Sequence, residues 1–231
     1  MSLKVKSKIR PTTIIWGIIV LILGACLLRV YIWEQNYYTE KEGSERAVAP
    51  IVNNNILDTS TVEEDEITDE ETLNHVVPAN HPRYMSIPKL GIKKARLIEV
   101  GVNDRGELGT PSNIFDVGWY NESSTPGTGG TAIYDGHNGG PTKEGVFKYI
   151  PDLVEGDIIT IERGDGEIFN YKVVNNSTVP IDKADERMNW ISRSPSPGQE
   201  SISIITCTGE WNQNDRTYLS RQFLRAILVK E

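Results

Sequence analysis

Cys207 is the residue best suited to covalent chemistry, and it follows the apolar run Ser201–Thr206 at the point where Thr208 and Gly209 begin a loop. A thiolate is a strong nucleophile when a base or a cation lies beside it. The end of a strand suits such a group, because the sheet fixes its backbone while the loop leaves the side chain accessible. The only other cysteine is Cys26, so the chain has no disulfide framework.

Two further strand ends can supply the base and the cation. His137 follows the run Thr131–Gly136, whereas His81 lies at the entrance of the domain and is typical of a linker. Arg221 begins the last apolar stretch and Arg225 lies within it. An arginine cannot act as a base near neutral pH, but its fixed donors can stabilise the developing charge of a carbonyl oxygen. Spacing alone leaves another interpretation open, in which the cysteine is a small buried side chain and the histidine a turn residue.

The first eighty residues differ sharply in charge and hydropathy from the rest. Residues 1–12 are basic and residues 13–33 are apolar apart from Arg29, which predicts a membrane-spanning signal anchor with a cytoplasmic N-terminus. Residues 34–80 carry twelve acids against two bases and predict a flexible acidic spacer. Residues 81–231 are then an extracellular domain of a single-pass protein of the cell membrane. There an unpaired thiol is exposed to oxidation and needs either burial or a function.

Two other interpretations of the apolar stretch compete with an anchor. A cleaved signal peptide would require an A-x-A site after the stretch, and the sequence has none. Lipoprotein processing at Cys26 would leave apolar rather than polar residues at the start of the mature chain. The length of the stretch favours the uncleaved anchor.

The composition, and the Gly, Pro and Asn residues that separate short apolar runs, indicate an all-β domain. With 38% hydrophobic and 24% charged residues the chain is neither collagen-like nor fully disordered, and a net charge of −8 argues against a general nucleic-acid binder. A hairpin is expected at 164–166, one helical turn at 146–150, and a short helix capped by Asp182 that runs to about Trp190. Strands are predicted over Tyr84–Ile87, Ala95–Val100, Thr131–Tyr134, Asp157–Glu162, Phe169–Val174, Ser201–Thr206 and Phe223–Val229. This pattern fits a closed barrel or a sandwich and does not choose between them.

Three motifs, in this order, resemble those of the sortases, the Gram-positive cysteine transpeptidases of the cell wall. Thr131–His137 resembles the strand that ends in the catalytic histidine, and Ser203–Cys207 (SIITC) is similar to the TLxTC signature of the nucleophile. Arg221–Ala226 resembles the final strand, headed by the catalytic arginine. Four further segments are most similar to class F: Val117–Tyr120, Pro126–Gly127, Gly145–Phe147 and Leu153–Asp157. Asn138–Gly140 departs from the Val-Asp that class F commonly has after the histidine.

The resemblance implies a closed eight-stranded β-barrel with one or two short helices. It implies that Cys207 is the nucleophile, His137 the general acid/base and Arg221 the group that stabilises the oxyanion and the substrate, with Arg225 and then Arg216 as the alternative arginines. The implied substrates are surface proteins with an LPXTG-like sorting signal, cleaved between Thr and Gly. The implied acceptor is a peptidoglycan precursor or another cell-wall amine.

The same resemblance implies no cofactor and names no metal ligand. Segment Asn175–Gln199 would form a wall of the substrate groove. The pilin-polymerising branch is less favoured, because no lid motif precedes the domain and no second apolar span precedes Glu231. The acids near the candidate loops are too scattered to define a calcium site: Asp135, Glu144, Asp182, Asp185 and Glu186.

Two alternative functions remain open from the sequence. An L,D-transpeptidase also uses a cysteine, a histidine and an arginine, but it would have a histidine and a glycine just before the cysteine, where this chain has Ile204–Thr206. A non-catalytic anchored barrel that binds wall polymers would bury Cys207 as an inert thiol.

Overall fold

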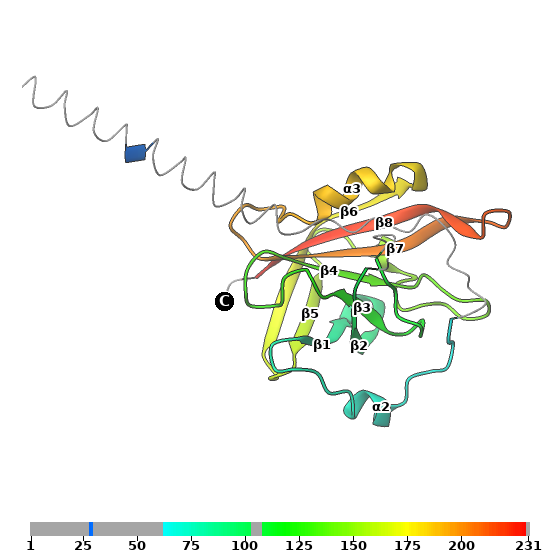
Figure 1. The fold of residues 1–231 in the computed structure, drawn as a ribbon, viewed down its shortest axis with the longest axis horizontal. Coiled ribbons are helices and arrows are strands. Elements are labelled where there is room, and N and C mark those ends of the chain that lie inside the picture. Colours follow the sequence, from blue (N-terminus) through cyan, green and yellow to red (C-terminus); the bar gives the residue numbers. More distant parts are fainter. Residues whose placement is uncertain (1–27, 30–61, 103–107, 230–231) are drawn as a thin grey trace, which may run out of the picture. The chain divides into compact units, whose positions relative to one another are not determined.

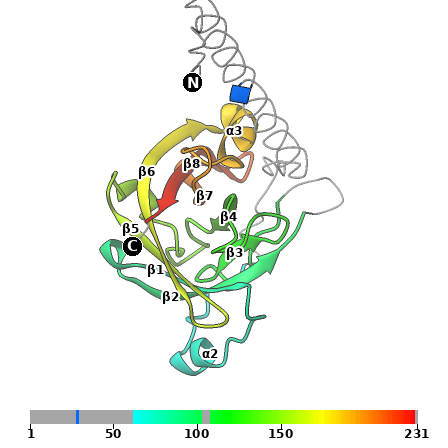
Figure 2. The same ribbon diagram turned by 90° about the vertical axis from the view of Figure 1, so that its left-hand side faces the viewer.

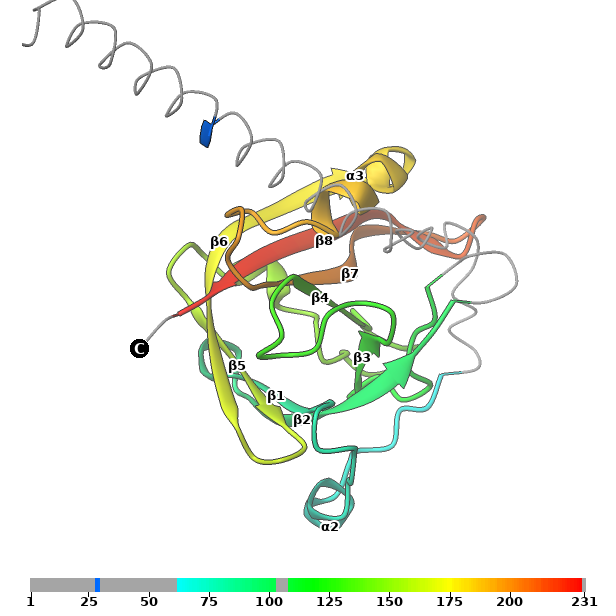
Figure 3. The ribbon, with the colours of Figure 1, turned by 60° about the vertical axis from the view of Figure 1, so that its left-hand side comes forward.

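Eight strands close into one barrel in the computed structural model, which describes residues 28–29, 62–102 and 108–229 (Figure 1). The order of neighbours is β1-β2-β3-β4-β7-β8-β6-β5, and β5 pairs with β1 to complete the ring, which can be followed in Figures 2 and 3. The strands are β1 (Pro82–Ile87), β2 (Ile92–Val100), β3 (Val117–Tyr120), β4 (Thr131–Gly136), β5 (Ile158–Arg163), β6 (Ile168–Pro180), β7 (Ser201–Asn212) and β8 (Thr217–Leu228). The expected closed eight-stranded barrel is therefore confirmed, and the sandwich is not formed.

Two of the pairings in the ring are parallel, β2 with β3 and β4 with β7, and the others are antiparallel. All seven predicted strands are present, and β3 was not among them. The hairpin predicted at 164–166 joins β5 to β6, with Gly166 at a positive φ of 87°. The parallel β4–β7 pairing matters most for the site, because it places the end of β4 at Gly136 beside Thr206. β7 continues to Asn212, so Cys207 lies within the strand and not at the strand end that the sequence predicts.

Side chains alternate between two apolar layers, one inside the barrel and one outside it. On β7, Ile202 and Ile204 belong to the interior cluster, whereas Ile205 belongs to a second cluster on the outer face. Helix α3 (Ala184–Ile191) covers that outer face through Ala184, Met188 and Ile191. Burial of such side chains stabilises a domain by roughly 1.5–3 kcal/mol each.

The short helices differ in detail from those predicted. Asp182 does not cap α3: it lies within the short 3₁₀ helix η4 (Ile181–Lys183), and α3 starts after Lys183 without a side-chain cap. The turn expected at 146–150 is followed by the 3₁₀ helix η3 (Ile150–Asp152). A further 3₁₀ helix, η2 (Pro88–Leu90), links β1 to β2.

Residues 62–80 differ from the flexible spacer that their charge predicts. Helix α2 (Asp69–Leu73) begins with a capping box between Thr68 and Glu71, and it lies across the barrel from α3 in all three views (Figures 1–3). Glu64 accepts hydrogen bonds from the backbone of Thr142 and Lys143. This part of the acidic segment therefore docks on the domain, because Glu64 finds backbone donors in the loop at residues 142–143.

The expected membrane anchor at 13–33 lies outside the described residues apart from Leu28 and Arg29. Within the parts of the chain that the structure describes, no helix is long and apolar enough to cross a bilayer.

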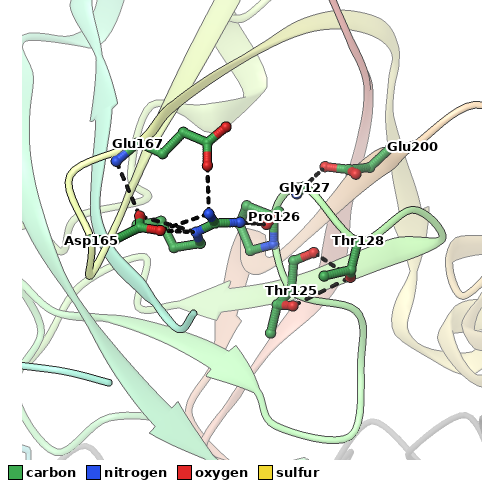
Figure 4. Close-up of polar contacts among 8 residues, drawn as sticks. Thr125, Pro126, Gly127, Thr128, Asp165, Glu167 and Glu200 are labelled. Atoms are coloured by element: carbon green, nitrogen blue, oxygen red, sulfur yellow. Dashed lines mark hydrogen bonds and ion pairs between the residues drawn. The ribbon is translucent and has the colours of Figure 1, made fainter. Parts of the chain in front are cut away.

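Glu200 and Arg163 tie the β3–β4 connection to the barrel wall, and Figure 4 shows the contact of Glu200 with Gly127. The Glu200 carboxylate, just before β7, accepts from the backbone N–H groups of Gly127 and Gly129 at 2.9 and 2.8 Å and from the Tyr171 hydroxyl at 2.6 Å. Arg163 donates to the carbonyl of Pro126 at 2.9 Å and pairs with the carboxylates of the 164–167 hairpin. These bonds fix the β3–β4 connection, and with it the start of the β4–β7 pairing.

Candidate active site

Cys207, His137 and Arg221 lie on three neighbouring strands of the barrel. The parallel register pairs Gly136 with Thr206, so His137 and Cys207 come next on their strands side by side. The antiparallel register pairs Cys207 directly with Arg221. Because side chains on a strand alternate, Cys207 shares the outer face of β7 with Ile205, and Arg221 shares that of β8 with Phe223.

One small recess collects the thiol and the imidazole. His137 and Cys207 line it together with Asn138, Gly139, Trp211, Thr217 and Tyr218. Trp211 and Tyr218 pack edge to face across the β7–β8 hairpin, with ring centroids 5.1 Å apart. The hairpin therefore supplies an aromatic wall next to the thiol.

Burial makes Cys207 a neutral thiol in this conformation. Its side chain is 9% exposed, and desolvation raises its pKa above the ordinary value. The Arg221 charge opposes this rise in pKa, and the charge of Asp135 adds to it. The described site thus holds a thiol that burial keeps neutral, with one charged neighbour that favours the thiolate and one that opposes it.

His137 is fixed by a backbone carbonyl. Its ring is 3% exposed, and its Nε2 lies 2.8 Å from the carbonyl oxygen of Pro111. A carbonyl can only accept, so Nε2 must carry a hydrogen, which leaves Nδ1 as the basic atom of the neutral ring. Burial lowers the pKa of His137, while the bond to Pro111 raises it less. The imidazole is therefore neutral near pH 7.

Arg221 lies within β8, four residues after the strand begins at Thr217, rather than at the head of the strand as predicted, and hydrogen bonds hold its guanidinium. Nη1 donates to the carbonyls of Tyr218 and Ser220 at 3.0 and 3.1 Å, and Nη2 donates to the Thr217 hydroxyl at 3.3 Å. These three bonds orient the guanidinium beside the strand partner Cys207. Such a fixed donor group suits a developing oxyanion.

The other two arginines lie away from the thiol. Arg225 shares the outer face, but it pairs with Ser203, four residues or about 13 Å along the strand from Cys207. Its Nη2 donates to the Arg193 carbonyl at 2.6 Å, and its guanidinium lies 4.1 Å from the centroid of the Trp190 ring. Arg216 sits in the 213–216 turn of the β7–β8 hairpin with a positive φ of 51°. The structure thus brings Arg221 to the cysteine and histidine, and not the other two.

The predicted substrate wall, Asn175–Gln199, forms more than a loop. Its first six residues continue β6, and the rest comprises η4, α3 and the turn that leads into β7. A groove of about 590 Å³ runs beside α3 over the Arg225 side chain. Its remaining lining residues are Glu186, Asn189, Trp190, Arg193, Ser194, Pro195 and Pro197.

Sequence reasoning missed several groups of this site. Pro111 contributes only a carbonyl, which no residue type reveals. Thr217 and Tyr218 come from β8 upstream of the predicted strand, and only the hairpin signal of the 213–216 turn could have placed them opposite Trp211. Within the described ranges, no group of three or more His, Cys, Asp or Glu side chains could hold a metal ion.

A family model for the sortase domain matches residues 85–228. Solved structures of similar fold include sortase C1 of GBS pilus island 1, at 16% identity over 88% of this chain and 84% of that one, with a TM-score of 0.51. Sortase C-1 from Actinomyces oris matches at 18% identity over 87% and 99%, with a TM-score of 0.50. Sortase A from Corynebacterium diphtheriae matches at 19% identity over 85% and 83%, with a TM-score of 0.50. No curated protein matches the sequence.

Proposed function

The chain belongs to the sortase family of cysteine transpeptidases, and on this premise we propose that it cleaves an LPXTG-like sorting signal between Thr and Gly and transfers the acyl group to a cell-wall amine. Class F remains our suggestion for the branch, on the motifs at Val117–Tyr120, Pro126–Gly127, Gly145–Phe147 and Leu153–Asp157. The observation that carries the proposal is the register of β4, β7 and β8, in which a thiol, an imidazole and a guanidinium follow one another on one outer face.

In the first step the Cys207 sulfur attacks the carbonyl carbon of the Thr–Gly bond. The thiol proton passes to His137 Nδ1, the ring atom that the Pro111 contact leaves basic. A carbon–sulfur bond forms, the carbon–nitrogen bond breaks, and the imidazolium returns the proton to the leaving glycine amine. The product is a thioester on Cys207 and a free amine.

In the second step an amine of a peptidoglycan precursor attacks the thioester. A carbon–nitrogen bond replaces the carbon–sulfur bond, and His137 accepts the amine proton and passes it to the sulfur. Both steps pass through a tetrahedral oxyanion, which the Arg221 guanidinium stabilises from the neighbouring strand. No external energy is needed, because the thioester conserves the acyl bond.

The groove beside α3 is the proposed path of the sorting signal. Its lining includes Arg225, which shares the outer face of β8 with Arg221, and its Trp190 and proline side chains offer apolar contacts to an extended peptide. A membrane anchor over residues 13–33 and a spacer that follows it complete this proposal. Tethering to the membrane that also holds the substrate would raise the effective concentration.

One observation favours a second candidate function, a non-catalytic anchored barrel that binds wall polymers. Cys207 is only 9% exposed, as an inert structural thiol would be. The L,D-transpeptidase alternative is not retained, because the chain belongs to the sortase family.

Replacing Cys207 by alanine separates the two functions. We expect Cys207→Ala in the full-length protein to abolish cleavage of an LPXTG-type peptide, a loss of at least about 10³-fold, because the nucleophile is gone. The thioester seen by mass spectrometry in the wild type should also disappear. An unchanged melting temperature controls for folding, and turnover at the wild-type rate would refute the transpeptidase proposal.

A further inference from the structure

Asn138 carries a buried acceptor that the proposed reaction does not use. It follows His137 directly in the chain and lines the recess that holds the Cys207 thiol. Asn138 is 5% exposed, and its Oδ1 is buried without a hydrogen-bond partner. The other atoms of this kind in the described parts of the chain belong to residues that do not line the recess: Tyr134, Asp135 and Arg225.

The main chain beside this oxygen is held by bonds of its own. The backbone carbonyl of Asn138 accepts from the N–H of Gly145 at 2.8 Å, and that of His137 accepts from Phe147 at 3.0 Å. A Cβ at Gly145 would lie 2.3 Å from the His137 carbonyl oxygen, so the returning chain packs directly against this segment. The main chain therefore fixes Asn138 in place, and the loop forms without its side-chain oxygen.

The usual structural reasons for an asparagine in a loop do not apply to Asn138. One reason is a side-chain acceptor for an N–H two residues on, as in Asn113, whose Oδ1 accepts from Phe115 at 2.9 Å. The other is a positive φ, which among the described non-glycine residues occurs only at Lys94 and Arg216. A buried acceptor without a partner destabilises the fold, and a donor on the substrate would remove that cost.

The scissile nitrogen is a donor that must enter the same recess. A peptide whose carbonyl carbon reaches the Cys207 sulfur brings the attached nitrogen with it, about 1.3 Å from that carbon. The nitrogen also receives its proton from His137, the chain neighbour of Asn138. Its N–H loses its water on entering the recess and needs a protein acceptor in exchange. Asn138 Oδ1 is a buried acceptor of the recess that has no other partner.

We propose that Asn138 is a further catalytic residue of this transpeptidase: its side-chain oxygen accepts the N–H of the scissile nitrogen and, in the second step, one N–H of the amine that replaces it. The inference rests on the proposed function of the site. In the first step this hydrogen bond persists while the carbon–nitrogen bond breaks and His137 protonates the nitrogen. No covalent bond to Asn138 forms or breaks.

The same contact selects the class of acceptor. The incoming amine takes the position that the leaving amine has vacated, because the second step is the reverse of the first with a new amine. It gives one hydrogen to His137 and keeps one on Asn138. A primary amine has the two hydrogens that this requires, whereas a secondary amine has only one. The acceptor should therefore be a primary amine.

An ester analogue of the substrate tests the first contact at a single atom. In an LPXTG-type peptide whose scissile N–H is replaced by oxygen, Asn138 has no donor to meet. With the full-length protein in excess, release of the C-terminal fragment in the first turnover measures the first step for both peptides. We expect Asn138→Ala to slow the amide about tenfold and the ester less than about twofold, because only the amide loses a hydrogen bond. An amide-to-ester rate ratio equal to that of the wild type would overturn the proposal.

Asn138→Leu repeats the test with a side chain of similar size that has no acceptor. We expect the same change in the ratio and no fall in melting temperature, because Oδ1 has no bond to lose. This variant decides the question even where Asn138→Ala fails to fold.

Asn113→Leu is the matched control, because Asn113 is equally buried but paired at both ends. It is 6% exposed, and its Nδ2 donates to the Asp65 carbonyl at 2.9 Å while its Oδ1 accepts from Phe115. We expect its melting temperature to fall and its amide and ester rates to change by the same factor. A shifted ratio in Asn113→Leu would contradict a specific role of Asn138.

Two small acceptors test the second contact. The wild type should transfer the acyl group to glycinamide at least about tenfold faster than to N-methylglycinamide, a secondary amine. In Asn138→Ala this preference should shrink to less than about threefold, whereas a preference due to the size of the methyl group would persist. An undiminished preference in Asn138→Ala would overturn the role of Asn138 in the second step.

This inference and the proposed function fail on different results. Peptide turnover by Cys207→Ala, or cleavage of neither peptide by the wild type, would refute the proposed function. A wild-type amide-to-ester ratio in both Asn138 variants, with an active wild type and an inactive Cys207→Ala, would refute only the inference about Asn138.

Discussion

The balance of charges at a single sulfur decides how this site can work. Burial raises the pKa of Cys207 and lowers that of His137, so at pH 7 the pair is a thiol and a neutral imidazole. Arg221 favours the thiolate and Asp135 disfavours it. A transferable proton therefore stays on the sulfur until the attack, when the imidazole can take it.

Replacing the two arginines separately should identify the catalytic one. Arg221→Gln is expected to lower kcat/KM for an LPXTG-type peptide about 10²-fold, because the oxyanion loses a fixed donor. It should also move the pH midpoint of Cys207 alkylation upward, since the charge that lowers the pKa of the thiol is removed. Arg225→Gln should leave that midpoint in place. A larger loss of kcat/KM at Arg225, or an unmoved midpoint in Arg221→Gln, would contradict the assignment.

Single residues were predictable where they directly follow an apolar run in the sequence. Cys207 and His137 each follow an apolar run, so their proximity follows once β4 and β7 pair in parallel, although β7 continues past Cys207. The choice between Arg221 and Arg225 did not follow, because both lie on the same face and only the register with Cys207 separates them. The role of the Pro111 carbonyl could not be predicted either, because every residue has a backbone carbonyl and the residue type does not reveal which one forms a bond.

At the scale of elements, the strands were predicted too short where polar residues or glycines interrupt them. β7 continues past Gly209 to Asn212, and β8 starts at Thr217, because Trp211 and Tyr218 pack against each other across the hairpin. β3 was missed, since four residues containing a glycine give little local signal. Its place is set by pairing with β2 and β4, the strands before and after it in the chain.

Glu200 is expected to contribute more to stability than its place in a polar turn suggests. Glu200→Ala removes the acceptor of two backbone N–H groups and of the Tyr171 hydroxyl, and we expect the free energy of unfolding to fall by about 2–3 kcal/mol. Urea denaturation measures this. Glu167→Ala, which removes an exposed partner of Arg163, is the control and should cost less than about 1 kcal/mol. Equal losses in the two variants would show that the Glu200 bonds are not stabilising.

At the scale of the whole chain, composition predicted that the folded domain begins further along the sequence than the structure shows. A run of acids normally stays solvated, and the boundary was expected at residue 80. Here Glu64 instead accepts from the backbone N–H groups of Thr142 and Lys143. A single sequence cannot reveal such docking, because the donors lie in loops far along the chain.

The docked segment should therefore stabilise the domain and its site. A fragment of residues 62–231 keeps the bonds of Glu63 to Ser112 and Ile114, close to the Pro111 carbonyl that fixes His137, whereas a fragment of residues 81–231 loses them. If these contacts are worth about 2 kcal/mol, the shorter fragment should melt about 4–8 °C lower in calorimetry. Its kcat for an LPXTG-type peptide should also fall, because the loop that orients the imidazole loses its outer support. Identical melting and kcat in the two fragments would mean that residues 62–80 rest on the barrel without supporting it, and that the composition-based boundary at residue 80 is the functional one.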